Sequence, residues 1–289
     1  MRVLDDATTG TLTIGGDLVV RRLGFGAMRI SGARNGDGVR DRDVARQLVR
    51  RVVERGVNFI DTANIYGYGQ SEEIIAEALR PYAADLVIAT KAGFLPGKIA
   101  PGQTSLPACG RPEHIKDECD RSLARLGVDV IDLYQVHVPD PDVPYADTVG
   151  AFVELQAAGK VRHIGVSNVS VEQLAEARSL CDVVSVQNRY NAADRTSESV
   201  LRYCERAGIA FLPWAPIILD GPAADGVASI ATAHGALPQQ VALAWLLRQS
   251  PVIVPIPGTS SIEHLDENVD AAWLDLTDDE VARLGTLLG

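Results

Sequence analysis

Short runs of apolar residues recur along the chain and alternate with longer stretches that are apolar at helical spacing. Eight of these runs are candidate strands, at residues 23–28, 57–61, 86–91, 130–137, 161–167, 183–187, 209–214 and 252–257. Most of them are apolar throughout rather than at every second position, which is typical of strands buried on both faces in a parallel sheet covered by helices. The pattern therefore predicts alternating β and α units.

The stretches between these runs have the spacing and the end signals of amphipathic helices. In the first of them Leu48 and Val52 stand four residues apart among other apolar positions, as expected of a helix that buries one stripe of its surface. Gly56 follows this stretch, and Pro112 and Pro238 lie near the starts of later ones. Glycine after a helix and proline in its first turn are common boundary signals.

Eight such units, with no Ser/Gly-rich linker between them, predict one closed barrel. We expect the α/β class, a (β/α)8 TIM barrel, with residues 1–289 forming a single domain. Two β-prone runs around Gly15 and Gly16 precede the barrel and predict an N-terminal β-hairpin with a two-residue turn. A doubly wound dinucleotide-binding fold is disfavoured, because its nearest glycine motif has Arg29 in place of the third glycine.

Composition and charge narrow the classes of function. The 289 residues are 46% hydrophobic and 22% charged, as in globular proteins. Aspartate and glutamate number 38 against 27 lysines and arginines, a formal net charge of −11, and such a surface repels nucleic acid and anionic membranes. The four cysteines form no CxxC pair, so we expect reduced thiols and no metal site. Without a leader-like or membrane-spanning apolar run, we expect a cytoplasmic monomer that acts on small molecules.

Polar side chains stand where the candidate strands end. Asp61, Lys91 and His137 close three consecutive strands, and Tyr66 follows in the loop after the first. TIM barrels carry their chemistry at this end of the strands, so we expect the four side chains to converge. Tyr66 can protonate a carbonyl oxygen as a general acid if the Lys91 cation stabilises its phenolate. Asp61 can balance the lysine charge, and His137 can donate a hydrogen bond to the oxygen.

Carbonyl reduction needs a hydride, which no side chain supplies, so a nicotinamide cofactor is implied. Trp214, at a later strand end, could stack on the nicotinamide ring. Ser167, Asn168 and Gln187 have the donors and acceptors to hold its carboxamide. The segment after the last strand opens a helix whose first N–H groups could bind the cofactor phosphates. The cofactor-binding residues expected there are Gly258, Thr259, Ser260, His264, Glu267 and Asn268.

Other interpretations of single residues were weighed. Lys91 alone would also suit the Schiff-base lysine of an aldolase-type barrel, but the nearby tyrosine argues against that chemistry. Residues 92–110 form a long connection rich in proline and glycine, and we expect it to act as a lid over the substrate. Substrate selectivity is expected around Met28, Phe94 and Pro139. The histidines interpreted as solvated or capping are His114, His163 and His234.

The motifs as a set resemble those of the aldo-keto reductase family. They are DTANIYGYGQSE at 61–72, ATKAG at 89–93, SLARLGVDVIDLYQVH at 122–137, GKVRHIGVSN at 159–168, VQNRYN at 186–191 and IPGTSSIEHLDEN at 256–268. The resemblance covers essentially the whole chain, and the IPGTSS variant is similar to the pyridoxal-reductase-like bacterial branch. It implies a (β/α)8 enzyme whose hairpin caps the barrel and which reduces aldehydes or ketones with NADPH.

The resemblance also assigns residues and leaves two alternatives open. It places the catalytic tetrad on Asp61, Tyr66, Lys91 and His137. Many relatives grip the 2′-phosphate of NADP with lysine and arginine in the final motif, where Gly258 and His264 stand here, so NAD is the alternative to NADP. A redox-sensing regulatory subunit with little turnover is the alternative function, because some relatives bind potassium channels. Pyridoxal is one candidate substrate.

Overall fold

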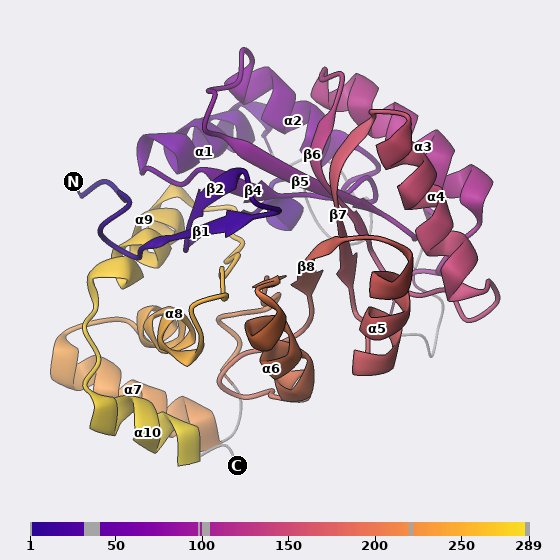
Figure 1. The fold of residues 1–289 in the computed structure, drawn as a ribbon. Helices are drawn as coiled ribbons and strands as arrows, with labels where there is room; N and C mark the ends of the chain where they lie inside the picture. Colours follow the sequence, from indigo (N-terminus) through magenta and orange to yellow (C-terminus); the bar gives the residue numbers. More distant parts are fainter. Residues whose placement is uncertain (1, 32–40, 98, 100–104, 220–221, 287–289) are drawn as a thin grey trace.

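The barrel strands lie at the centre of the molecule and the helices surround them (Figure 1). The structure, a computed structural model, describes residues 2–31, 41–97, 99, 105–219 and 222–286. The strands follow one another in the sheet in chain order and all pair in parallel. They are β3 (Phe25–Gly26), β4 (Phe59–Asp61), β5 (Val87–Ala92), β6 (Ile131–Val136), β7 (Val161–Ser167), β8 (Val183–Gln187) and β9 (Ala210–Phe211).

Segment 252–257, the eighth expected strand, closes the ring without being a regular strand. It bridges to β9 on one side. On the other side the N–H groups of Gly24 and Gly26 donate to the carbonyls of Pro255 and Pro257, with N···O distances of 2.9 and 3.1 Å. The two prolines have no N–H to donate in return, so a full ladder cannot form. The (β/α)8 TIM barrel is thus confirmed, with its last strand irregular.

The helices begin and end close to the expected signals. In α1 the buried stripe consists of Ala45, Leu48, Val49 and Val52, and Gly56 follows with a φ of 81°. Pro112 and Pro238 occupy the first turns of their helices. The helices are α1 (Arg42–Glu54), α2 (Gln70–Leu79), α3 (Pro112–Leu126), α4 (Tyr145–Ala157), α5 (Val171–Leu180), α6 (Glu198–Ala207), α7 (Pro222–His234), α8 (Pro238–Gln249), α9 (Ile262–Asp270) and α10 (Asp278–Thr286).

The expected hairpin, β1 (Thr11–Ile14) and β2 (Leu18–Arg21), caps the end of the barrel at which the strands begin. Asn58, just before β4, donates to the carbonyl of Val19 at 2.9 Å. The turn also includes Asp17, so the expected two-residue turn is wrong. Asp17 accepts a 2.6 Å contact from His163, whose side chain is only 14% exposed. The hairpin covers most of His163. The expectation that this histidine is solvated or capping is therefore wrong.

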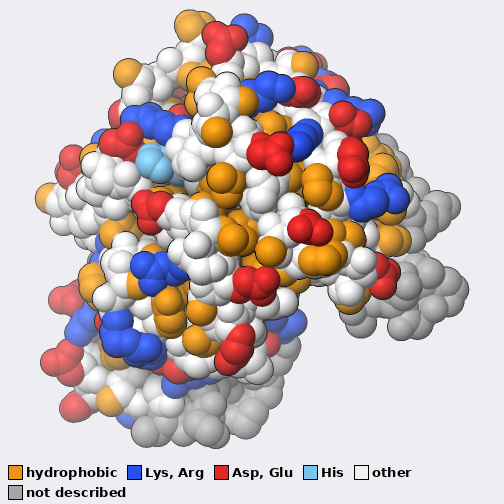
Figure 2. All heavy atoms as spheres, turned by 45° about the vertical axis from the view of Figure 1, so that its right-hand side comes forward, with side chains coloured by type: hydrophobic (Ala, Val, Ile, Leu, Met, Phe, Trp, Pro, Cys, Tyr) orange, Lys and Arg blue, Asp and Glu red, His pale blue; other side chains and the backbone are white. Residues whose placement is uncertain are grey.

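Acidic and basic side chains are interspersed on the face shown in Figure 2 rather than segregated into single-sign patches. Ion pairs are frequent between neighbouring helices, as between Arg42 of α1 and both Glu73 and Glu77 of α2. Such exposed pairs contribute little to stability each. Within the described ranges, no helix combines the length and apolar character of a membrane span. The four cysteines are free thiols.

Candidate active site

A buried ion pair lies at the ends of β4 and β5. Nζ of Lys91 lies 2.7 Å from Oδ2 of Asp61 and 2.7 Å from the carbonyl oxygen of Thr62, and Lys91 is fully buried. The second carboxylate oxygen, Oδ1, accepts hydrogen bonds from Nε2 of Gln187 at 2.7 Å and of Gln135 at 3.2 Å. Both charged groups are thus saturated with partners, as a buried pair must be to persist.

The lysine ammonium also faces the tyrosine of the following loop. Nζ of Lys91 lies 5.2 Å from the ring centroid of Tyr66, which is half-buried. Burial by itself would lower the pKa of Lys91, but the charge of Asp61 and the phenol of Tyr66 outweigh it, so this pKa is raised. Lys91 therefore stays protonated at neutral pH and presents a fixed positive charge to the tyrosine.

The loop from β4 to α2 holds Tyr66 through unusual backbone angles. Gly67, Tyr68 and Gly69 are all left-handed, with φ of 59°, 55° and 94°. A Cβ at Gly67 would lie 2.6 Å from the side chain of Ser31, so glycine is needed there on two grounds. The carbonyl of Tyr66 accepts from the N–H of Ser71 in the first turn of α2, at 3.2 Å. The sequence GYG thus folds the loop tightly enough to return Tyr66 over the barrel mouth.

His137 follows β6 and packs beside the tyrosine. Its ring centroid lies 5.9 Å from that of Tyr66 and 4.7 Å from that of Phe94, both edge to face. Burial, together with the nearby charge of Lys91, holds the pKa of His137 well below its usual range. The imidazole is therefore neutral at physiological pH and can donate a hydrogen bond, while its buried Nδ1 has no hydrogen-bond partner among the described residues.

Three of the residues expected to hold the nicotinamide ring meet next to His137. Nδ2 of Asn168 donates to the carbonyl of His137 at 2.9 Å and to Oγ of Ser167 at 3.0 Å. Nε1 of Trp214 donates to Oδ1 of Asn168 at 3.0 Å, which fixes the plane of the half-buried indole. Gln187 is also present, but its amide nitrogen is directed to the buried carboxylate of Asp61. Trp214 and Asn168 are thus arranged together, whereas Gln187 belongs to the ion-pair network.

Two residues in this region were not anticipated from the sequence. Gln135 lies in register with Lys91 on the neighbouring strand, and its position two residues before His137 could have shown that it points into the barrel. Arg189 stands 5.6 Å from the ring centroid of Trp214 and 2.8 Å from a carboxylate oxygen of Asp194. The contact between Arg189 and Trp214 joins residues that are distant in the sequence. It forms because the segments after β8 and β9 pair with each other.

The residues expected to hold the cofactor phosphates lie along α9 and the turn before it. Oγ1 of buried Thr259 accepts from the N–H of Ser261 at 3.0 Å. Oγ of Ser261 in turn accepts from the N–H of His264 at 3.3 Å, which caps α9. Asn268 is 3% exposed. The other expected residues differ in exposure: Gly258, Ser260 and Glu267 are half-buried, and His264 is exposed.

Gly258 has a structural reason to be glycine. A Cβ there would lie 2.7 Å from the carbonyl oxygen of Gly26, where the irregular eighth strand meets β3. A lysine at this position would meet the same obstacle at its Cβ. The absence of a basic residue at Gly258 is therefore coupled to how this barrel closes.

The described ends of the 92–110 connection are tied to each other beside the site. Phe94 and Ala108 form an antiparallel bridge, and the N–H of Cys109 donates to the carbonyl of Gly93 at 2.8 Å. Phe94 is the residue that packs against His137. Residues 98 and 100–104 lie outside the described part of the chain, so the expected lid stays a prediction. Met28 and Pro139 are half-buried.

Comparison with protein families and curated proteins agrees with this geometry. A family model described as the aldo/keto reductase family matches residues 22–288. An uncharacterized oxidoreductase of Schizosaccharomyces pombe is 41% identical over 283 residues, which cover 97% of this chain and 90% of the relative. A protein named pyridoxine 4-dehydrogenase, from Escherichia coli, is 40% identical over 284 residues, covering 96% of this chain and 98% of that protein.

Solved structures of aldo-keto reductases share this fold, and one of them holds NADP. An aldo/keto reductase from Klebsiella pneumoniae in complex with NADP and acetate superposes with a TM-score of 0.82 at 27% identity, covering 96% of this chain and 95% of that one. A thermostable aldo-keto reductase in complex with the inhibitor epalrestat gives a TM-score of 0.84 at 30% identity, with 96% and 99% coverage. The similarity therefore extends over the whole described barrel.

Proposed function

The chain belongs to the aldo/keto reductase family, and we propose that it is an NADPH-dependent reductase of an aldehyde or ketone in which Tyr66 is the general acid. The observation that carries the proposal is the buried Asp61–Lys91 pair, which holds an ammonium 5.2 Å from the Tyr66 ring. A fixed charge at that place has no packing role, since apolar side chains would fill the barrel equally well.

Tyr66 and His137 divide the work at the carbonyl oxygen. His137 is neutral because burial and the Lys91 charge hold its pKa well below the usual range, so it can orient the oxygen by a hydrogen bond but has no extra proton to give. Tyr66 transfers its hydroxyl proton to the oxygen. The Lys91 ammonium stabilises the phenolate that remains. The proton donor and the hydrogen-bond donor are thus separate groups, set by their environments.

The positioning of the charge depends on three donors to one carboxylate. Lys91 binds Oδ2 of Asp61, while Gln187 and Gln135 bind Oδ1. With both oxygens held, the carboxylate cannot rotate away, and the ammonium keeps its direction toward Tyr66. Preorganisation of this kind avoids reorganisation when charge develops at the oxygen.

The residues present fit a nicotinamide dinucleotide. Trp214 offers a half-buried aromatic face whose plane is fixed by Asn168, and a nicotinamide ring stacks well on such a face. Helix α9 begins with a serine cap and a positive helix end, which suits phosphate. When bound, the cofactor would supply the hydride. Ser167, Asn168 and Trp214 would hold its ring, and Thr259, Ser260, His264, Glu267 and Asn268 would line its other half.

NADP is preferred over NAD in this proposal because the related structures from Klebsiella pneumoniae are complexes with NADP and NADPH. The chain has Gly258 and His264 where basic residues would otherwise grip the 2′-phosphate. Attraction to phosphate must therefore come from the α9 terminus and from hydroxyl groups. A fluorescence titration tests this choice: NADPH should bind more tightly than NADH, and the reverse order by about tenfold would overturn it.

The function itself is tested with a panel of carbonyl compounds, followed by the absorbance of the reduced nicotinamide. Pyridoxal belongs in the panel because of the Escherichia coli relative named pyridoxine 4-dehydrogenase. Tyr66→Phe should lower kcat by at least about 100-fold, the usual contribution of a general acid. Tyr203→Phe is the control, since this hydroxyl accepts a hydrogen bond from Arg178 at an exposed position between α5 and α6.

Two outcomes would contradict the proposal in different ways. Full activity of Tyr66→Phe would show that another group protonates the oxygen. Tight NADPH binding without turnover of any carbonyl would favour the redox-sensing regulatory subunit instead. The proposed single domain, cytoplasmic location and monomeric state are checked separately by limited proteolysis, fractionation and light scattering.

A further inference from the structure

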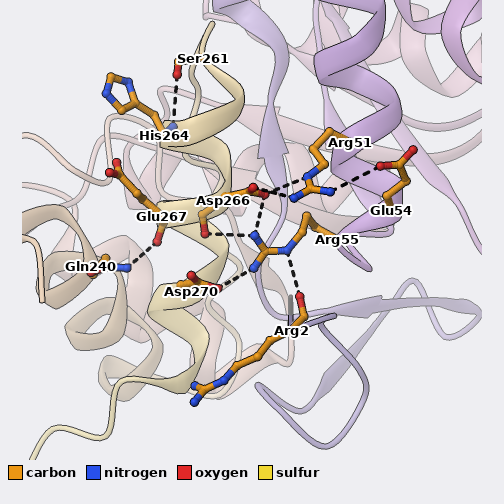
Figure 3. Close-up of polar contacts among 10 residues, drawn as sticks. All are labelled: Arg2, Arg51, Glu54, Arg55, Gln240, Ser261, His264, Asp266, Glu267 and Asp270. Carbon is orange, nitrogen blue, oxygen red and sulfur yellow. Dashed lines mark hydrogen bonds and ion pairs between the residues drawn. The ribbon is translucent and has the colours of Figure 1, made fainter.

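A buried arginine joins α1 to α9. Arg55 is 2% exposed, although its guanidinium is charged. It donates to Oδ1 of Asp266 and to Oδ1 of Asp270, both at 2.6 Å, and to the carbonyl of Arg2 at 3.0 Å. Arg51, one turn earlier on α1, donates to both carboxylate oxygens of Asp266 at 3.0 and 2.7 Å. We refer to Arg51 and Arg55 with Asp266 and Asp270 as the arginine clamp (Figure 3).

The clamp grips one face of α9 and the cofactor residues lie on the other. Asp266 and Asp270 are four residues apart, so they share a face of the helix. His264 and Asn268 are also four apart and are offset from the aspartates by two residues, about 200° around a helix of 3.6 residues per turn. Figure 3 shows both arginines on one side of α9 and His264 on the opposite side. Rotation of α9 would therefore move both faces together.

Apolar packing alone leaves this rotation weakly determined. Helix α9 has nine residues, of which only Leu265, Asn268 and Val269 are buried. Contacts between apolar side chains are not directional. A guanidinium, by contrast, donates in a fixed plane, and the two-pronged contact of Arg51 with Asp266 specifies direction as well as distance. The directional part of the α1–α9 contact is thus the clamp.

We propose that Arg51 and Arg55 are positioning residues for the nicotinamide dinucleotide: by holding Asp266 and Asp270 they fix the rotation of α9, and so the place of His264 and Asn268 on its cofactor face. This inference rests on the proposed function, because it requires that α9 contact the cofactor. In this proposal the arginines act through Asp266 and Asp270 rather than by contact with the cofactor. The clamp also gives a reason why α9 could bind the cofactor although its cofactor face carries no pair of basic residues. The two arginines hold the helix from its opposite face.

The test compares charge-removing variants of the clamp with a matched arginine elsewhere. The variants are Arg55→Met, Arg51→Met and Arg55→Lys, and the control is Arg202→Met, because Arg202 also binds two carboxylates, Glu198 and Glu205, but on α6. Each purified protein is titrated with NADPH by fluorescence. Amide hydrogen exchange of α9 is measured without nucleotide, and kcat and both KM values are measured with a carbonyl substrate.

Arg55→Met should raise the Kd for NADPH about tenfold, and Arg51→Met about threefold, since Arg55 still holds Asp266 in that variant. Arg55→Lys should fall between wild type and Arg55→Met, because an ammonium keeps the charge but not the planar fork. Exchange of α9 amides should quicken in the same order. The KM for NADPH should follow the Kd, while kcat at saturating NADPH and the KM for the carbonyl change by less than about twofold. Arg202→Met should leave the Kd and α9 exchange unchanged.

The outcomes separate this inference from the function on which it rests. If Arg51→Met and Arg55→Met bind NADPH as wild type does, the inference is wrong even though the protein is a reductase. If they weaken NADPH no more than Arg202→Met does, a general loss of stability explains the effect and the inference is also wrong. If Arg55→Met does not fold, Arg51→Met and Asp270→Asn decide the matter by the same measurements. If wild type binds neither NADPH nor NADH, the proposed function itself fails.

Discussion

The ammonium of Lys91 lies 2.7 Å from the carboxylate of Asp61, and neither side chain is more than 3% exposed. Removing two charges from water costs several kcal/mol per ion, which mutual attraction offsets only when every donor and acceptor is satisfied. Gln187 and Gln135 complete that satisfaction at Asp61. In the proposed mechanism the barrel carries this pair for the charge that it presents to Tyr66, at a cost in stability that apolar residues would not impose.

Asp61→Asn should destabilise the protein by about 3–5 kcal/mol, because it leaves the Lys91 ammonium buried without its counter-charge. The free energy of unfolding is measured by denaturant titration. Asp17→Asn is the control: its carboxylate pairs with Arg162 and His163 but is 44% exposed, and its loss should cost about 1 kcal/mol or less. An equal decrease in the free energy of unfolding in Asp61→Asn and Asp17→Asn would show that burial of the Asp61–Lys91 pair does not raise the cost of removing its carboxylate.

A double variant separates stability from activity at the same site. Asp61→Asn combined with Lys91→Met removes both buried charges, keeps an oxygen to which Gln187 and Gln135 can donate, and should recover much of the stability lost in Asp61→Asn alone. Reductase activity should stay lost, because no cation then faces Tyr66. Recovery of activity together with stability would contradict the role given to Lys91.

His137 should make the stability of the protein depend on pH in the acid range. Its pKa is held well below the ordinary value by burial and by Lys91. Below pH about 6.5 the unfolded chain binds a proton at this residue that the folded protein does not, so the free energy of unfolding falls as pH falls. The contribution is up to about 1.4 kcal/mol per pH unit, and it ends at the folded pKa.

The measurement is the free energy of unfolding of wild type and His137→Gln from pH 8 to pH 5, by urea titration. Above the ordinary histidine pKa the imidazole is neutral in both states, so the difference between the two proteins should be constant there. Below it, wild type should lose stability faster than the variant. Parallel curves across the whole range would mean that His137 titrates normally.

Trp214 should report cofactor binding by its fluorescence. It is half-buried at the barrel mouth and bonded to Asn168, whereas Trp245 is fully buried in the core and Trp273 follows α9. NADPH should quench wild-type fluorescence, and Trp214→Phe should remove most of the change and raise the KM for NADPH. Trp273→Phe is the control and should keep the quenching. An undiminished signal in Trp214→Phe would move the nicotinamide away from this residue.

The barrel, and the grouping of Asp61, Tyr66, Lys91 and His137 at one end of it, could be predicted because both are encoded locally. Strand β7 at Val161–Ser167 and strand β8 at Val183–Gln187 coincide with their apolar runs. Polar residues at strand ends could be assigned to one face because parallel strands place their carboxyl ends together. For the same reason Asp61, Lys91 and His137 could be grouped before any distance was known. Local pattern sufficed wherever the partner of a residue was fixed by strand register.

The remaining features depend on contacts between distant segments. The irregular strand at 252–257 results from two prolines whose carbonyls alone can pair with β3, and an apolar run does not reveal this. His163 is covered by the hairpin turn, and Arg55 is buried against α9, 211 positions further along the chain. For His163 and Arg55 a remote element supplies the partner and covers most of the side chain. Sequence spacing contains no signal for such an encounter.

Glycine-to-alanine substitution should have opposite effects on stability at the barrel closure and within a helix. A Cβ at Gly26 would lie 2.7 Å from the carbonyl oxygen of Ile256, inside normal contact distance and against backbone that cannot move freely. Gly26→Ala should therefore destabilise the protein by about 1–3 kcal/mol, the cost of overpacking. Gly150, within α4, has open space around its Cβ position, and Gly150→Ala should stabilise the protein by about 0.5–1 kcal/mol through helix propensity.

Both effects are measured by denaturant unfolding, and cofactor titration adds a second test. Because Gly26 adjoins Gly258 across the closure, strain at Gly26 should spread to the turn that leads into α9. Gly26→Ala should then also weaken NADPH binding, while Gly150→Ala should not, since α4 lies elsewhere in the helical ring. If Gly26→Ala were as stable as wild type, the close approach of the two glycines would not be what holds the eighth segment against β3.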